Sequence, residues 1–206
     1  MKYTRKTGTK IPRRIYIFTE GSKTEPKYFR EFIQYFKISQ AQVKVIDRET
    51  SASSPKSVIN DMISYVQENK IYASITTKND IYCLVIDTDK WGLNLIDAVN
   101  EAHQRKYLVA LSNPCFEIWL LMHFQDADTI LKNAHLLKTK ADINAKIHSL
   151  NIYDINITGK NEKDYFPRTD SAVKTAEILD TKPQQRLLQQ IGSRVYLLVN
   201  ILKEYI

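Results

Sequence analysis

Residues 80–87 read Asp-Ile-Tyr-Cys-Leu-Val-Ile-Asp, an apolar run enclosed by two acidic residues. A strand with one face in water alternates apolar and polar residues, and this run does not alternate. An unbroken apolar run of this length is typical of a central strand that is covered on both faces, as in parallel sheets. The stretch therefore predicts the middle strand of an α/β fold.

Strand and helix patterns alternate along the chain on both sides of this run. Further strands are predicted at residues 14–19, 43–46 and 107–111. Helices are predicted from Thr24, from Ser54 and around residues 93–99, because apolar residues recur there at helical spacing. Thr24 and Ser54 are expected to cap their helices, since each hydroxyl precedes a proline that suits a first helical turn. This order predicts a parallel sheet with right-handed crossovers.

The pattern changes after Ser112. Residues 116–124 (FEIWLLMHF) predict a very apolar helix, and the patterns that follow are mostly helical, ending in a core helix over 195–202. We therefore divide the chain into a basic arm over 1–14, an α/β domain over 15–125 and a helical extension over 126–206. The extension is expected to pack back onto the sheet.

Composition excludes several classes of protein. The chain has 206 residues, of which 43% are hydrophobic and 26% charged, so it can bury a core and is not wholly disordered. Its apolar runs are shorter than the roughly 18 residues that a membrane span needs, and no secretory leader is recognisable. We expect a cytoplasmic protein without membrane contact.

Cysteine and histidine usage argues against a zinc site. The chain has two cysteines and four histidines, and no pair of cysteines has the spacing of a zinc-binding motif. Cys83 lies inside an apolar run and is expected to be a small buried residue. Cys115 has no sequence signature of an activating partner, which argues against acyl transfer through a cysteine nucleophile.

Positive charge is concentrated at the amino terminus. The formal net charge is +7, and the residues before Ile15 contain no acid but six basic residues, Lys2, Arg5, Lys6, Lys10, Arg13 and Arg14. Such an arm attracts a polyanion, because binding releases condensed counterions. A solvated tail that only keeps the protein in solution is the alternative interpretation.

Acidic residues follow two of the predicted strands. Glu20 comes directly after the first strand, and Asp87 and Asp89 come at the end of the central one. Ligands of open parallel sheets bind at the carboxyl ends of strands, so neighbouring strands would bring these acids together. Carboxylates so close repel one another unless a cation intervenes, and an all-oxygen set suits Mg²⁺ or Mn²⁺. The chemistry this predicts is phosphoryl transfer or phosphodiester cleavage; the alternative is that the acids are helix caps.

Residues 21–24 (GSKT) resemble the end of a phosphate-binding P-loop. Alignment of the motif's lysine on Lys23 places Ile17 and Ser22 where two glycines are required, which excludes a Walker A site. Lys23 and the first amides of the following helix remain candidates for binding a substrate phosphate, and an ordinary surface lysine is the alternative.

A third candidate segment, residues 112–117 (SNPCFE), follows the strand at 107–111 and faces the same edge of the sheet. Asn113 is a candidate for substrate phosphate binding; alternatively it caps a helix that begins at Pro114. Glu117 lies among apolar residues, where a carboxylate is costly unless it is paired or bound to metal, so it is a candidate metal ligand or general base. His123 is expected to be a helix-end histidine with a hydrogen-bonding partner rather than a ligand.

Three motifs, in this order, resemble those of the RloB family: residues 18–29 (FTEGSKTEPKYF), 87–89 (DTD) and 112–124 (SNPCFEIWLLMHF). The third is long enough to be specific, and residues 194–199 (RVYLLV) add to the similarity. The RloB family is similar to Toprim-type nucleases, which have a compact α/β domain that binds Mg²⁺. The resemblance therefore implies a Toprim-like domain over residues 15–125.

The resemblance also implies roles for individual residues and partners. Glu20 would be the general acid/base or a metal ligand, Asp87 and Asp89 metal ligands, and Glu117 an additional ligand. The family is associated with anti-phage defence, often beside an AAA-type ATPase that is RloA-like. By resemblance, the substrate is RNA, with tRNA favoured, ahead of DNA, and its cleavage halts the infected cell.

Two further functions remain open from the sequence. One is a non-catalytic module that binds nucleic acid or regulates an ATPase complex, in which the acids are structural. The other is a phosphatase or nucleotidyl-transferase that applies the same metal chemistry to a small substrate. A topoisomerase or primase is not expected, since the chain has neither a tyrosine-nucleophile motif nor a zinc ribbon. Whether the chain forms a homo-oligomer is also left open.

Overall fold

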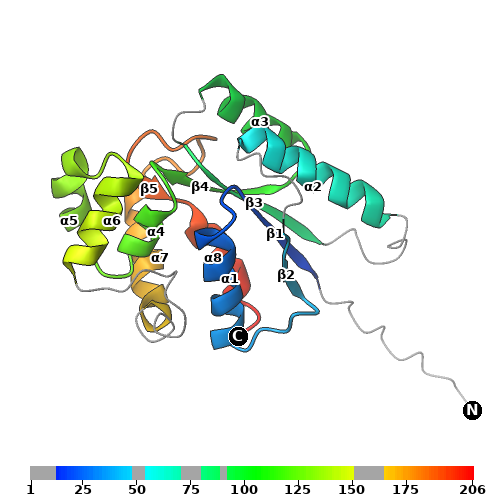
Figure 1. The fold of residues 1–206 in the computed structure, drawn as a ribbon, viewed down its shortest axis with the longest axis horizontal. Coiled ribbons are helices and arrows are strands. Elements are labelled where there is room, and N and C mark those ends of the chain that lie inside the picture. Colours follow the sequence, from blue (N-terminus) through cyan, green and yellow to red (C-terminus); the bar gives the residue numbers. More distant parts are fainter. Residues whose placement is uncertain (1–12, 48–53, 71–79, 89–91, 151–164) are drawn as a thin grey trace, which may run out of the picture.

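The computed structural model describes residues 13–47, 54–70, 80–88, 92–150 and 165–206. Within these ranges, eight α-helices flank a five-stranded sheet with the strand order β2-β1-β3-β4-β5 (Figure 1). The first four strands are parallel and β5 is antiparallel to β4. The predicted α/β fold with a mostly parallel sheet is confirmed.

The strand predicted from the apolar run lies in the middle of the sheet. The strands are β1 (Ile15–Thr19), β2 (Val43–Val45), β3 (Ile81–Asp87), β4 (Leu108–Asn113) and β5 (Gly192–Ser193). β3 pairs with β1 on one side and β4 on the other, and its residues Cys83–Ile86 are all buried. Coverage on both faces explains why the run has no alternation.

β1 and β3 are direct neighbours in parallel register. Ile15 lies opposite Ile81, and Thr19 lies opposite Val85. Both strands therefore end at the same edge of the sheet, with Glu20 and Asp87 at their carboxyl ends. Glu20 and the acid at the end of β3 can meet only because β1 and β3 are neighbours.

Alternate side chains of the strands fill two separate cores. Cys83 and Val85 face the core formed with α1 (Thr24–Tyr35), α4 (Glu117–Leu121) and α8 (Val195–Lys203). Leu84 and Ile86 face the core formed with α2 (Pro55–Lys70) and α3 (Leu93–Gln104). Figure 1 shows α2 and α3 together on one side of the sheet and α1 and α8 on the other.

The segment after residue 125 is mostly helical and packs on the sheet, as expected. It contains α5 (Ala127–Asn133), α6 (Lys140–Ser149), α7 (Thr169–Leu179) and α8, with short 3₁₀ helices at Ala134–Leu136 and Phe166–Arg168. Strand β5 was not predicted, because two residues are too few to show a pattern. Its pairing with β4 makes this segment part of the sheet.

Two helix starts differ from the prediction and one agrees. Thr24 lies inside α1, and the N-cap position is held by Lys23, whose side chain makes no capping hydrogen bond. α4 begins only at Glu117, and Asn113 belongs to β4, so neither Asn113 nor Pro114 starts that helix. Ser54 does cap α2, since its hydroxyl accepts a hydrogen bond of 3.1 Å from the Ser57 N–H.

No helix in the described part of the chain is long and apolar enough to cross a membrane. Most of the basic arm, residues 1–12, lies outside the described residues. Arg13 forms an exposed ion pair with Glu204 at 3.2 Å, and the backbone N–H of Arg14 donates to Asp80 Oδ1 at 3.0 Å.

Candidate functional site

The carboxylate of Glu20 lies against the end of β3. The Glu20 N–H continues the ladder by donating to the carbonyl of Val85 at 2.9 Å, and Glu20 Oε2 accepts a hydrogen bond of 3.0 Å from the Asp87 N–H. The sheet therefore brings Glu20 and Asp87 together, as the sequence predicted. Asp89, the third predicted acid, lies outside the described residues.

Thr88, the residue directly after Asp87, is tied to the end of β4. Thr88 donates its backbone N–H to the carbonyl of Ser112 at 2.8 Å and its hydroxyl to Asn113 Oδ1 at 3.0 Å. Asn113 Nδ2 in turn donates to the carbonyl of Gln190 at 3.0 Å. Both ends of the Asn113 amide are thus engaged with protein, and its predicted contact with a substrate phosphate stays a prediction.

Lys23 lies at the start of α1, where its side chain is exposed. Two residues later, Glu25 is buried and folds back over Gly21, so a Cβ atom built on Gly21 would lie 2.1 Å from Glu25 Oε2. The pKa of Glu25 is raised, mainly by burial and further by the carboxylate of Glu117. Hydrogen bonds from the backbone of Glu25 and Gly21, and the charge of Lys140, offset only part of this rise. Nothing in its local sequence distinguishes Glu25 from an ordinary acidic residue in the first turn of a helix.

Glu117 is buried and is paired with a lysine from the helical extension. Lys140 Nζ lies 2.6 Å from Glu117 Oε1, and the side chains are 3% exposed for Glu117 and 54% exposed for Lys140. Glu117 Oε2 is also buried, and it has no hydrogen-bond partner among the described residues. Sequence reasoning expected a partner for Glu117 but missed Lys140, because the two are brought together only by the packing of α4 against α6.

Cys115 is buried in the segment between β4 and α4 and is unsuited to nucleophilic chemistry. Burial raises the pKa of its thiol, and the carboxylates of Glu117 and Asp87 raise it further. A thiol held in its neutral form is a poor nucleophile. Asp87 pairs with Ser112 near the carboxyl end of β4, and Glu117 begins α4 shortly after that strand, so both acids lie near the same edge of the sheet.

His123 is a buried residue with two hydrogen-bonding partners. Its Nε2 lies 3.2 Å from the Tyr28 hydroxyl, and its Nδ1 lies 3.0 Å from the carbonyl of Trp119. Burial lowers the pKa of His123 to about 4. The expectation of a histidine satisfied by protein partners is confirmed.

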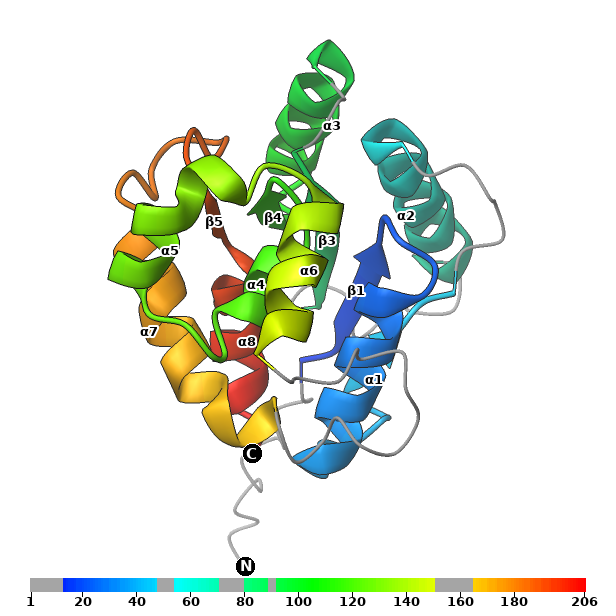
Figure 2. The same cartoon turned by 60° about the vertical axis from the view of Figure 1, so that its left-hand side comes forward.

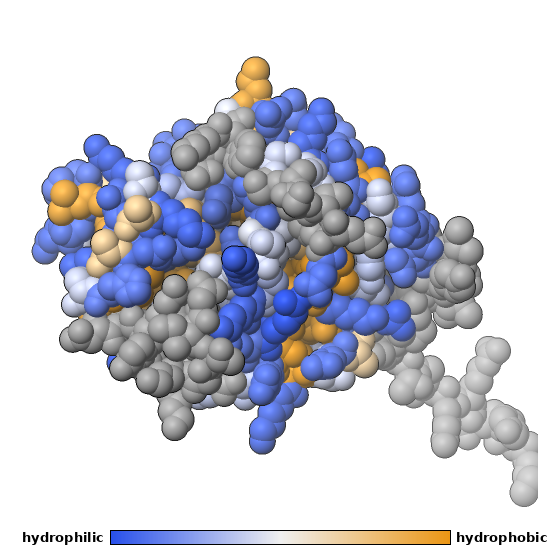
Figure 3. Space-filling view, viewed as in Figure 1, coloured by the Kyte–Doolittle hydropathy of each residue, from blue (hydrophilic) through white to orange (hydrophobic). Residues whose placement is uncertain are grey.

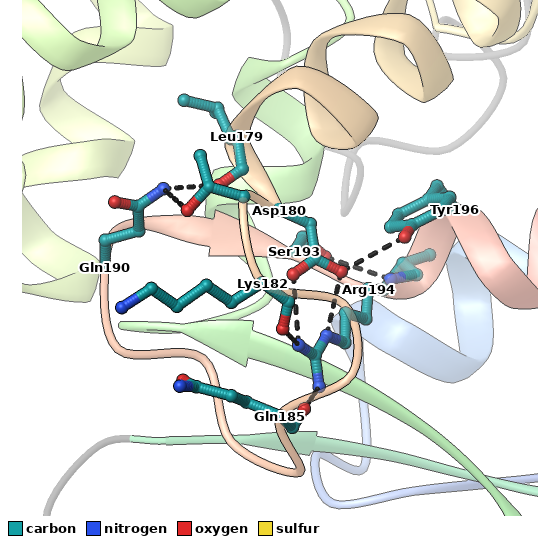
Figure 4. Close-up of polar contacts among 10 residues, drawn as sticks. Leu179, Asp180, Lys182, Gln185, Gln190, Ser193, Arg194 and Tyr196 are labelled. Carbon is teal, nitrogen blue, oxygen red and sulfur yellow. Dashed lines mark hydrogen bonds and ion pairs between the residues drawn. The ribbon is translucent and has the colours of Figure 1, made fainter.

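A buried ion pair is bonded to the loop before β5 (Figure 4), and Gln190 of this loop accepts a hydrogen bond from Asn113. The Arg194 guanidinium makes two hydrogen bonds to the Asp180 carboxylate, at 2.9 and 3.0 Å, and Tyr196 donates its hydroxyl to the same carboxylate at 3.1 Å. Arg194 also donates to the carbonyls of Lys182 and Gln185, which lie in the loop before β5. The loop that supplies the Gln190 carbonyl to Asn113 is therefore held in place by the buried Arg194 side chain.

Comparison with known proteins places the chain in a family. The profile of the family described as RloB-like protein matches residues 15–202, which is most of the chain. The chain belongs to the RloB-like family. No curated protein and no solved structure matches it.

The match extends over all the described elements from β1 to α8 of this RloB-like protein. It spans Glu20, Asp87, Asn113 and Glu117, and it also includes α6 with Lys140. The family match therefore includes most of the helical extension.

The described carboxylates are of the kind that binds Mg²⁺, but they do not form a complete set of ligands. Within the described residues, no group of three acidic, histidine or cysteine side chains is arranged to hold a metal ion. Glu20 and Asp87 lie together and offer only oxygen ligands, which suits Mg²⁺ or Mn²⁺. Asp89, two residues beyond Asp87, is the remaining acid of the predicted set.

A surface hollow elsewhere in this RloB-like chain has different chemistry. It lies between α1 and the edge strand β2, and its lining contains no carboxylate; the lining residues are Arg30, Ile33, Gln34, Gln40, Val43, Lys44, Val45 and Ile46. Figure 3 shows apolar surface beside hydrophilic surface in this region. The candidate site is therefore the carboxyl edge of β1, β3 and β4, where the acids lie.

Proposed function

We propose that this RloB-like chain is a Mg²⁺- or Mn²⁺-dependent endonuclease of Toprim type that cleaves phosphodiester bonds, in RNA ahead of DNA, in anti-phage defence. The observation that carries the proposal is the hydrogen bond between the Asp87 N–H and Glu20 Oε2 at the ends of two paired parallel strands. Family membership and the net charge of +7 support a nucleic-acid substrate. tRNA is the favoured substrate, and an RloA-like AAA-type ATPase is the proposed partner.

Each acidic residue has a proposed role at this edge. Glu20, Asp87 and Asp89 would hold the metal ion, which supplies charge neutralisation at the phosphate and a water of lowered pKa. Glu20, at the end of β1, would also accept or return a proton. Lys23 would bind a phosphate from the exposed start of α1, where backbone N–H groups favour anions.

Cleavage assays on the purified protein test the proposal. The protein is incubated with total tRNA, generic RNA and duplex DNA, in Mg²⁺, in Mn²⁺ and in EDTA. We expect cleavage that needs the metal and that is lost in Glu20→Ala and Asp87→Ala. Asp128→Ala is the matched control, since Asp128 is an exposed acid of α5 that is remote from β1 and β3 in sequence.

Metal binding is measured on the same variants. A metal ion that binds only the folded protein stabilises it by about 2.7 kcal/mol at a hundredfold excess over Kd. We expect a thermal shift with Mn²⁺ in the parent protein and in Asp128→Ala, and a smaller shift in Glu20→Ala. Salt-sensitive nucleic-acid binding with neither cleavage nor a metal-induced shift would contradict the proposal and support a non-catalytic binding or regulatory module.

A further inference from the structure

Glu117 and Lys140 form an ion pair in which the carboxylate is buried and the lysine reaches the surface. Glu117 Oε1 and Lys140 Nζ are 2.6 Å apart, with the carboxylate side chain 3% exposed and the lysine side chain 54% exposed. The buried carboxylate cannot move far, because α4 is surrounded by core residues. It therefore fixes the position of an ammonium group that still has access to solvent.

Helix stability does not explain a lysine at this position. Lys140 is the first residue of α6, and a positive charge at a helix amino terminus opposes the helix dipole. The helix start is already satisfied by a capping box, in which Thr139 accepts from the Asp142 N–H and Asp142 accepts from the Thr139 N–H. The position that disfavours a lysine favours an anion, since helix amino termini bind phosphate groups.

Lys140 lies at the same edge of the sheet as the predicted metal-binding acids. Its charge interacts with the carboxylates of Glu117 and Glu25, and Glu25 is folded over Gly21, the residue after Glu20. Figure 2 shows α6 beside α4, and Glu117, the partner of Lys140, begins α4 shortly after the carboxyl end of β4. The ammonium group therefore lies near the carboxyl edge of the sheet, where the proposed function places the substrate.

We propose that Lys140 is a substrate-binding residue of this site, that its ammonium group contacts a backbone phosphate of the nucleic acid, and that Glu117 is its positioning residue. The inference rests on the proposed function and adds a substrate contact to it. It gives Glu117 a different role from the additional metal ligand that the family resemblance implies, because one oxygen of Glu117 is already bonded to Lys140.

Binding of a fluorescent RNA oligonucleotide in EDTA tests Lys140 without metal or cleavage. We expect Lys140→Met to weaken binding about 10-fold and to lower the salt dependence of log K by about 0.7 to 0.9, the value for one lost phosphate contact. Lys140→Arg keeps the charge and should restore most of the affinity. Lys132→Met is the matched control, since it removes an exposed lysine from α5 of the same helical extension and should leave the salt dependence unchanged.

The single variant Lys140→Met leaves a buried carboxylate without its cation and is expected to be less stable. The double variant Glu117→Gln/Lys140→Met removes both charges and serves as a folded background, checked by its thermal unfolding. We expect the double variant to show the same loss of RNA affinity as Lys140→Met. An affinity and a salt dependence equal to those of the parent protein would overturn the inference.

Metal affinity separates the two roles of Glu117. Mn²⁺ binding to Glu117→Gln, followed by electron paramagnetic resonance, should stay within about twofold of the parent protein, because Glu117 neither binds the metal nor orients its ligands; loss of a residue that orients a ligand costs about 10-fold or more. A loss of that size would overturn the inference and place Glu117 in the metal site. If the parent protein neither binds nor cleaves nucleic acid, the proposed function itself fails; if it does both and Lys140→Met is unchanged, only this inference fails.

Discussion

The Thr88 hydroxyl donates a hydrogen bond of 3.0 Å to Asn113 Oδ1, which joins the residue after β3 to the end of β4. Asn113 is itself held in place, since its Nδ2 donates to the carbonyl of Gln190. Thr88, the residue between Asp87 and Asp89, is therefore anchored to the neighbouring strand β4. The acids at this edge depend on a polar network as well as on strand pairing.

Thr88→Val removes the hydroxyl while it keeps the shape of the side chain. We expect Mn²⁺ affinity to fall by about 10-fold, because groups that orient metal ligands typically contribute that much. Thr88→Ser keeps the hydroxyl and should restore the affinity. Mn²⁺ titration followed by electron paramagnetic resonance measures both, and equal affinities for the valine and serine variants would refute a positioning role for this hydroxyl.

The Gly21→Ala variant tests the packing of Glu25 over the first motif. The new Cβ atom would lie 2.1 Å from Glu25 Oε2, so the buried carboxylate must move and give up its hydrogen bond from Gly21. We expect the free energy of unfolding to fall by about 1–2 kcal/mol in urea. In a Glu25→Ala background the same substitution should cost much less, and equal costs in both backgrounds would contradict the contact.

The fold and part of the site follow from the sequence for identifiable physical reasons. Residues 80–87 predict the central strand because burial on both faces requires an unbroken apolar run. Glu20 and Asp87 are predicted to meet because parallel strands share one carboxyl edge. Lys140 could not be predicted, since nothing in its local sequence connects it to Glu117. Hydrophobic periodicity can predict that α4 and α6 are helices, but it does not predict that the two helices pack against each other.

The buried pair of Arg194 and Asp180 is expected to contribute strongly to stability. Arg194→Met leaves the Asp180 carboxylate buried without its cation, and we expect a loss of about 3–5 kcal/mol in the free energy of unfolding. Arg194→Lys should recover little of this, because a lysine cannot reproduce the two parallel hydrogen bonds to Asp180 and the contacts with the loop.

Urea unfolding measures these losses, and Arg186→Met is the control. Arg186 is exposed and donates to the exposed side of α3 at Asn100, so its removal should change the free energy of unfolding by less than about 0.5 kcal/mol. Similar losses at Arg186 and Arg194 would show that the buried pair has no special contribution.

His123 predicts how stability depends on pH. Burial lowers its pKa to about 4, from an ordinary value of 6.5, so between these values the unfolded chain binds a proton that the folded protein excludes. The contribution of neutral His123 is therefore complete above pH 6.5 and is lost as the pH falls toward 4, by up to about 1.4 kcal/mol per pH unit. Urea unfolding at pH 7, 6 and 5 measures this slope.

His123→Asn should reduce the slope whatever its effect at pH 7, and His135→Asn, at an exposed histidine, should leave it unchanged. An unchanged slope in His123→Asn would mean that His123 takes up its proton without unfolding, and that the hydrogen bond with Tyr28 does not require a neutral ring.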